Sequence, residues 1–116
     1  MKKSRTIYIM MMFSLYIGMN QNLSSQVLEE DSLALVALYD STNGSDWTNN
    51  TNWLTGQPVS DWFGVSVSNK RVTQINLSNN NLVGTIPPNF DRLTGLIDLN
   101  LERNDLSGSF PQEILS

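Results

Sequence analysis

A pattern of apolar and polar positions occurs twice in the second half of the chain, with a period of 24 residues. Nine positions of the first copy recur in the second. Chance apolar matches would not also align an asparagine, a glycine and a proline. Such a short period predicts structural units that stack on one another. The matched pairs are Val72/Leu96, Ile75/Leu99, Leu77/Leu101, Asn80/Asn104, Leu82/Leu106, Gly84/Gly108, Ile86/Phe110, Pro87/Pro111 and Phe90/Ile114.

Each copy predicts a short strand followed by a turn. Residues 75–77 alternate apolar and polar side chains, which is typical of a strand with one buried face. Asn80 and Asn104 follow the strands, where a buried asparagine can bond the backbone of its own turn and of the next coil. We expect Gly84 to permit a tight bend and Pro87 to fix the return segment.

One helix is predicted upstream of the repeats. Apolar residues recur at helical spacing from Leu28 to Tyr39, and acids at 29–31 complement the positive end of a helix dipole. We expect the helix to run from about Glu30 to Ser41 and to be stopped by Gly44. A loop rich in asparagine and threonine follows, and Lys70-Arg71 marks a turn before the repeats.

Three tryptophans, Trp47, Trp53 and Trp62, lie close together in this loop-rich stretch. One interpretation is an exposed aromatic platform for sugars. The other is a plug that shields the open apolar face of the first repeat, because large aromatic side chains bury area efficiently. We favour the plug, since the end of a stack of repeats needs such cover.

The repeat resembles the plant-type leucine-rich repeat, Leu-x-x-Leu-x-Leu-x-x-Asn-x-Leu-x-Gly-x-Ile-Pro. The match runs from Val72 to Ser116, with Val72 in place of the first leucine and Phe110 in place of the isoleucine. Residues 31–67 resemble the family's N-terminal capping region, a helix followed by Trp-x-Gly-Val, which stands here at residues 62–65.

The cysteines of the capping region are the main departure from plant members. A cysteine pair brackets the Trp-x-Gly-Val element in those proteins, whereas Ser60 and Val67 occupy the two places here. In this respect the chain resembles secreted bacterial or algal relatives more than plant receptors. The resemblance implies an α/β solenoid with a helical and loop-rich cap at 26–71. Coils with short parallel strands follow at 72–95 and, incompletely, at 96–116.

A basic start and a short apolar run predict a secretory signal peptide at residues 1–25. Three basic residues stand among the first five positions, ahead of the apolar run 7–19, and Ser24 and Ser25 supply small residues before the cleavage point. The apolar run is shorter than the roughly 20 residues that cross a bilayer. The alternative is an uncleaved membrane anchor. Both interpretations predict a secreted or cell-surface protein.

Composition argues against several kinds of chemistry. The chain has no cysteine and no histidine, which excludes cysteine–histidine and serine–histidine–aspartate triads and Cys/His zinc sites. From residue 26 onward, 11 acidic residues stand against four basic ones, and so acidic a body repels nucleic acid. We expect no enzyme activity, no cofactor and no nucleic-acid partner.

Two weaker candidates fail on spacing. Residues 40–44 resemble the start of a calcium loop, but Gly44 is fifth rather than sixth, and Thr51 stands where a bidentate glutamate is expected. Asp46 and Asp61 could in principle form a glycosidase acid pair, but nothing in their spacing supports it. We therefore expect no metal site and no catalytic residue.

Strand positions between the buried leucines are the expected binding surface. The resemblance implies that they form a concave face, on which members of the family commonly bind partners. The alternatives are that these side chains are only solvated, or that the binding footprint lies on other repeats. The candidates are Thr73, Gln74, Asn76, Ser78, Asn79, Ile97, Asp98, Asn100, Glu102 and Arg103.

We interpret the chain as part of an exported, non-catalytic recognition module that binds a protein or peptide. The alternatives are a structural or adhesive surface scaffold with affinity for carbohydrate, and the ectodomain of a receptor-like kinase. Only one full repeat and most of a second are present, whereas about three are usually needed for a stable core. We therefore expect a longer protein, held at a membrane only by an uncleaved signal or a downstream segment.

Overall fold

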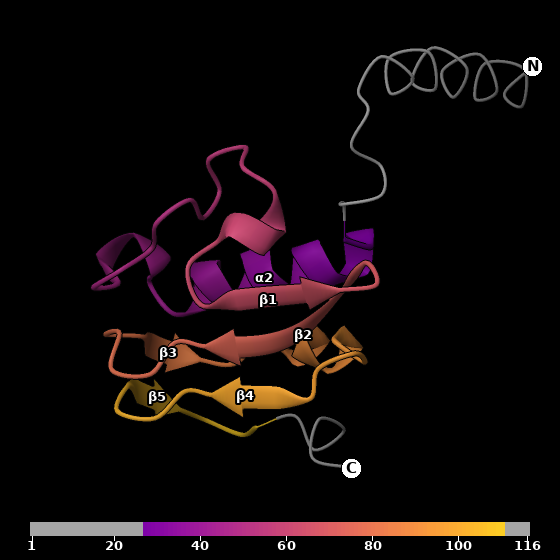
Figure 1. Cartoon of the computed structure of the whole chain (residues 1–116). Helices are drawn as coiled ribbons and strands as arrows, with labels where there is room; N and C mark the ends of the chain where they lie inside the picture. Colours follow the sequence, from indigo (N-terminus) through magenta and orange to yellow (C-terminus); the bar gives the residue numbers. More distant parts are fainter. Residues whose placement is uncertain (1–26, 111–116) are drawn as a thin grey trace, which may run out of the picture.

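The computed structural model describes residues 27–110 (Figure 1). The predicted signal peptide, and Pro111 and Ile114 of the second repeat, lie outside the described residues. The described helices are the α-helix α2 (Glu29–Ser41) and the 3-10 helices η2 (Gly44–Asp46), η3 (Val59–Asp61) and η4 (Pro88–Arg92). The described strands are β1 (Val65–Ser68), β2 (Arg71–Asn76), β3 (Val83–Thr85), β4 (Asp98–Asn100) and β5 (Asp105–Ser107). We call residues 27–71 the cap segment, residues 72–95 the first coil and residues 96–110 the second coil.

The larger of the two sheets in the described residues has the strand order β1-β2-β4. Strands β1 and β2 form an antiparallel hairpin, turned by Asn69 and Lys70 with positive φ angles of 56° and 66°, as a two-residue type I′ turn requires. The turn therefore lies one residue earlier than predicted. Strand β4 runs parallel to β2 and pairs Gln74 with Asp98 and Asn76 with Asn100, which is the 24-residue period of the sequence.

A second, parallel pair formed by β3 and β5 was not predicted. The expected bend at Gly84 was wrong, because this residue lies inside β3 with a φ of 140°. A Cβ at Gly84 would collide with the carbonyl oxygen of Ser41 at the end of α2. The N–H of Val83 donates to the carbonyl oxygen of Thr42 at 3.2 Å. The glycine thus lets β3 pass directly against the end of the helix.

Helix α2 begins one residue earlier than predicted and ends at Ser41, as predicted. The residue that leaves the helix with a left-handed backbone is Asn43, with a φ of 56°, rather than Gly44. A Cβ at Gly44 would overlap the ring of Tyr39. Glycine is therefore needed here for its small size and not as a helix stop.

The hydrophobic core lies between α2, the larger sheet and η4, and it is shared by the cap segment and the first coil. Ile75, Leu77 and Leu82 of the first coil are at most 1% exposed. Their second-coil equivalents are only partly buried, because among the described residues no further coil covers them (Figure 1). The buried core residues are Ala34, Leu35, Leu38, Trp47, Trp53, Trp62, Val65, Val72, Ile75, Leu77, Leu82, Ile86, Phe90 and Leu93.

Two asparagine side chains join successive turns of the chain. The Nδ2 of Asn104 donates to the carbonyl oxygen of Leu77 at 2.8 Å. Its Oδ1 accepts from the N–H groups of Asn80 at 3.0 Å and Leu82 at 2.9 Å. Asn80 exchanges two hydrogen bonds of 2.7 and 2.9 Å with the backbone of Asn49 in the cap segment.

The predicted bonds within the residue's own turn are present for Asn104, whose Nδ2 donates to the carbonyl oxygens of Leu101 and Glu102 at 2.9 and 3.2 Å. The bonds to a neighbouring turn run to the preceding turn, whereas we expected them to run to the next coil. The reason is the direction of the backbone donors. The N–H groups of Leu77 and Asn79 already donate forward, to carbonyl oxygens of Asn100 and Glu102 at 2.9 and 2.8 Å. The backbone groups that remain in that turn are the N–H groups of Asn80 and Leu82 and the carbonyl oxygen of Leu77. The side chain of Asn104 bonds all three, because buried backbone groups need a hydrogen-bond partner.

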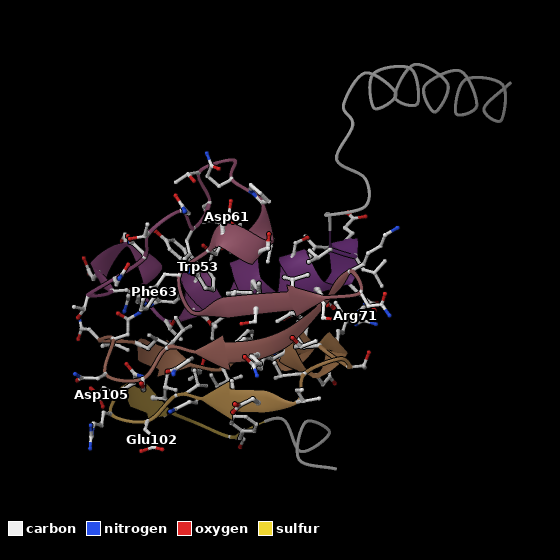
Figure 2. The ribbon with its side chains drawn as sticks, in the orientation of Figure 1. Trp53, Asp61, Phe63, Arg71, Glu102 and Asp105 are labelled. Atoms are coloured by element: carbon white, nitrogen blue, oxygen red, sulfur yellow. The ribbon has the colours of Figure 1, made fainter. Side chains whose placement is uncertain are left out.

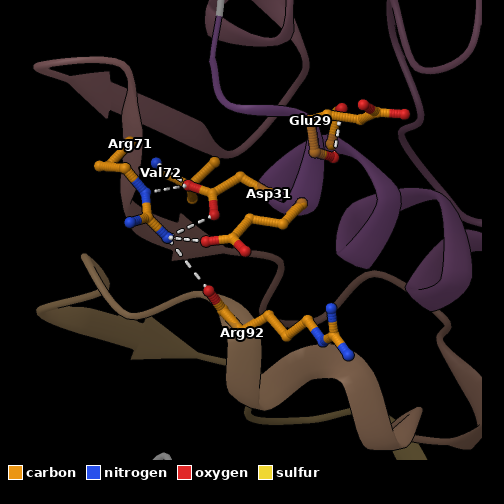
Figure 3. Close-up of polar contacts among 7 residues, drawn as sticks. Glu29, Asp31, Arg71, Val72 and Arg92 are labelled. Carbon is orange, nitrogen blue, oxygen red and sulfur yellow. Dashed lines mark hydrogen bonds and ion pairs between the residues drawn. The ribbon is translucent and has the colours of Figure 1, made fainter.

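A buried carboxylate joins α2 to β2 (Figure 3). Asp31 is 0% exposed, and its Oδ2 accepts from the N–H of Val72 at 2.8 Å and from Nε of Arg71 at 3.1 Å. Its Oδ1 accepts from Nη2 of Arg71 at 2.8 Å. The same nitrogen also reaches the carbonyl oxygen of Arg92 in η4 at 3.1 Å and Glu30 at 3.3 Å. These bonds link three segments of the chain, namely α2, the start of β2 and η4.

The carboxylate of Asp31 favours the charged form of Arg71. Hydrogen bonding to Asp31 raises the pKa of Arg71 above the ordinary arginine range, against the opposing effect of burial, and the charges of Asp31 and Glu30 add to the rise. A pKa that is raised in the folded state gives stabilisation that is complete below the unfolded-state pKa. This stabilisation is lost when the pH rises through the folded-state pKa of Arg71.

Replacing Asn104 with alanine should lower the free energy of unfolding by about 3 kcal/mol, because two N–H groups and three carbonyl oxygens lose a partner. The matched control is Asn76→Ala, which removes only an exposed local turn and should cost below about 1 kcal/mol. Urea unfolding monitored by tryptophan fluorescence measures both variants. Equal losses in the two variants would contradict the bridging role of Asn104.

Replacing Asp31 with alanine should cost about 3 kcal/mol, because it leaves the guanidinium of Arg71 and the N–H of Val72 without their buried partner. Glu30→Ala removes the neighbouring carboxylate, which is 44% exposed, and should cost below about 1 kcal/mol. The same urea titration compares them. Equal losses of unfolding free energy in the Glu30 and Asp31 variants would contradict the view that burial makes the Asp31–Arg71 ion pair strongly stabilising.

Candidate functional site

The β1-β2-β4 sheet carries a set of polar side chains on the side turned away from the core. Ser66, Gln74 and Asp98 form a row across the three strands, and all three are exposed. Asn76 and Asn100 form a second row beside them. We call these five residues the polar sheet face. Because alternate residues of a strand point to opposite sides, buried neighbours such as Ile75 hold this face from behind.

A hollow of about 150 Å³ lies on the polar sheet face, lined by its five residues together with Gly64 and Ile75. Gly64 stands at its edge with a φ of 82°, and a Cβ there would collide with the carbonyl oxygen of Asn76. The N–H of Asn76 donates to the carbonyl oxygen of Gly64 at 2.8 Å. The glycine is therefore needed to bring the cap segment against β2 and to complete the hollow.

The two asparagines of the face are held by local turns. Oδ1 of Asn76 accepts from the N–H and the hydroxyl of Ser78 at 3.2 and 2.9 Å, and Oδ1 of Asn100 accepts from the N–H of Glu102 at 3.0 Å. An amide oxygen fixed in this way leaves the NH₂ group turned away from the turn. Within residues 27–110, neither NH₂ group has a hydrogen-bond acceptor.

Four of the residues predicted from sequence, Gln74, Asn76, Asp98 and Asn100, are brought together around the hollow. Thr73 is partly buried and donates its hydroxyl hydrogen to the carbonyl oxygen of Ser66 at 3.3 Å. The remaining candidates lie beside the hollow rather than in it. Ser78, Asn79, Glu102 and Arg103 occupy the turns after the strands, and Ile97 is 80% exposed just before β4.

Ser66 is the member of the polar sheet face that sequence reasoning missed. It lies in β1, which precedes the repeats and has no counterpart 24 residues later. The signal that could have found it is the alternation of valine and serine along residues 65–68, a pattern typical of a half-buried strand.

The three tryptophans lie inside the cap segment and not on a binding surface. Trp47, Trp53 and Trp62 are 3–7% exposed, with ring centroids 4.8 Å apart in both successive pairs. Each indole N–H donates to a carbonyl oxygen, those of Thr42, Phe63 and Gln57 in turn, at 2.9–3.0 Å. Rings buried and bonded in this way offer no open indole face to a sugar.

Two further features are absent from residues 27–110. This part of the chain holds no group of three or more side chains placed to bind a metal ion. None of its helices has the length and apolar character needed to cross a membrane.

Comparison with known proteins identifies the repeat. Residues 71–93 match the family model of the Leucine Rich Repeat. The Receptor-like kinase TMK4 of Arabidopsis thaliana is 36% identical over 84 residues, which is 71% of this chain and 8% of that protein. Protein MALE DISCOVERER 1 of the same plant is 33% identical over 102 residues, which is 83% of this chain and 14% of that protein.

Among solved structures, the chain is similar to one titled as the crystal structure of PEPR1–AtPEP1, with a TM-score of 0.56 and 23% identity over 75% of this chain and 13% of that one. At this level of identity the likeness shows the fold alone. The repeats described above are leucine-rich repeats of the plant type. The chain is thus a leucine-rich-repeat protein, and it spans about a tenth of the length of the curated relatives named here.

The burial of the indoles predicts weak quenching by acrylamide. Because all three rings are at most 7% exposed, the folded chain should be quenched several-fold less than the same chain unfolded in urea. Stern–Volmer plots in the two states measure the difference. Equal quenching constants would contradict the packed arrangement and reopen the possibility of an exposed aromatic platform.

Proposed function

We propose that the polar sheet face binds a protein or peptide ligand, and that the chain serves as a non-catalytic recognition module outside the cytoplasm. The observation that carries this proposal is the hollow between the two rows of polar side chains, with two amide NH₂ groups directed away from their turns. Amides, a hydroxyl and one carboxylate are groups that hydrogen-bond a ligand. Because β-structure and local turns hold them in place, little conformational entropy is lost on binding.

Similarity supports the kind of ligand and the location. One relative is named a receptor-like kinase of Arabidopsis thaliana, and one solved structure is titled with two components, PEPR1 and AtPEP1. The proposed location rests on this likeness and on the signal peptide predicted at residues 1–25. Kinase activity of the relatives is not carried over, since the chain covers 8% of the Receptor-like kinase TMK4. The adhesive, sugar-binding alternative loses its best candidate site with the burial of the tryptophans.

Selection of random peptides displayed on phage against the immobilised full chain tests this function. We expect selected peptides to lose at least about tenfold in affinity, or about 1.4 kcal/mol, for a variant that combines Asp98→Ala, Asn100→Ala and Arg103→Asn. Asparagine is chosen at 103 because the backbone there is left-handed, with a φ of 59°.

The matched control replaces two exposed acids of the cap segment, Asp40→Ala and Asp61→Ala. Figure 2 shows Asp61 at the end of the molecule opposite Glu102 of the second coil. The control should bind the selected peptides as the parent chain does. Binding that survived the triple variant, or that was lost in the control, would refute the assignment to the polar sheet face and the adjoining turn that carries Arg103.

A further inference from the structure

We propose that the hollow on the polar sheet face receives a lysine or arginine side chain of a peptide. In this arrangement the carboxylate of Asp98 binds the cationic group, while the amides of Asn76 and Asn100 donate to the neighbouring peptide carbonyl oxygen. This inference rests on the proposed function and names the chemistry of the ligand.

The carboxylate of Asp98 carries the first step of the argument. It is exposed at the rim of the hollow. Among residues 27–110, the ion pairs join Arg71 to Glu30 and Asp31, and Asp98 takes part in none of them. An ionised carboxylate only accepts hydrogen bonds, so the group that complements it is a cationic donor. Gln74, its partner in the sheet, is neutral and leaves this charge uncompensated.

The two asparagine amides supply the second step. Their oxygens are engaged by Ser78 and Glu102, so their free groups are donors. They stand on adjacent parallel strands, which are spaced about 4.8 Å apart. A pair of donors beside a carboxylate suits a peptide carbonyl oxygen next to a cationic side chain. The amide donors then bond the carbonyl oxygen, and the carboxylate binds the cationic group.

Size and overall charge supply the third step. The hollow of about 150 Å³ is smaller than the roughly 300–1,000 Å³ of pockets that enclose drug-sized molecules, and it suits a single ammonium or guanidinium group. Residues 27–110 contain ten acidic and four basic side chains. The resulting negative field attracts cationic peptides before contact.

Nuclear magnetic resonance titration of the ¹⁵N-labelled full chain tests the inference with defined probes. The probes are acetylated and amidated pentapeptides, four alanines around a central lysine or, for comparison, a central glutamine. We expect the lysine peptide to shift the side-chain NH₂ signals of Asn76 and Asn100 and to bind at least about fivefold more tightly than the glutamine peptide, or about 1 kcal/mol.

Three variants separate the roles of the lining residues. Asp98→Asn should reduce the preference for lysine to below about twofold, whereas Asp61→Asn, which removes the same charge from the cap segment, should keep it. Asn100→Ala should weaken both peptides and leave their ratio unchanged. Each variant's backbone spectrum checks that the fold is kept.

The outcomes distinguish this inference from the proposed function. The cation assignment is overturned if the Asp98→Asn variant keeps the preference for the lysine peptide. It is also overturned if the parent chain shows no such preference. If phage-selected peptides nevertheless depend on the polar sheet face, the recognition role stands without the cationic ligand. If they do not depend on that face, both proposals fail.

Discussion

The carboxylate of Asp31 is the point at which three segments of the chain meet. It holds the start of β2 through the guanidinium of Arg71 and the N–H of Val72, and Arg71 also bonds the carbonyl oxygen of Arg92 in η4. A buried charge is tolerated only where its hydrogen bonds are satisfied. Helix α2, β2 and η4 are therefore restricted to the arrangement that completes this set, and β2 in turn positions β1 and β4 by strand pairing.

The remainder of the core supports the polar sheet face from behind. The three packed indoles fill the cap segment, while Ile75 and Leu77 are buried beneath the sheet. Asn80 and Asn104 tie the turns after the strands to the turns that precede them. The side chains on the outer side are thus fixed by backbone that cannot shift without breaking buried bonds. Stability of the cap segment and the proposed recognition by the sheet both depend on the same packing.

Local and periodic features could be predicted from the sequence, whereas contacts between distant residues could not. The 24-residue period located β2 and β4, and helical spacing located α2 to within one residue. The pairing of Asp31 with Arg71 spans 40 residues, and an acid at a helix start is equally well explained by the helix dipole. Strand β3 was missed because residues 83–85 contain a glycine, and β5 because it is three residues long and begins with an aspartate; both residue types are uncommon in strands. Ser66 was missed because β1 lies outside the repeat.

Cooperative unfolding of the cap segment with the first coil can be measured directly by comparing two probes in one urea series. Fluorescence reports on the cap segment, which holds all three tryptophans. Hydrogen exchange reports on the N–H of Leu77 and Leu82, bonded to Asn100 and Asn104 of the second coil. If the cap segment and the first coil form one packed unit, the free energies of unfolding from fluorescence and from hydrogen exchange should agree within about 0.5 kcal/mol. Protection of these two N–H groups that outlasts the fluorescence transition would show that the repeats fold without the cap segment, and would contradict this account.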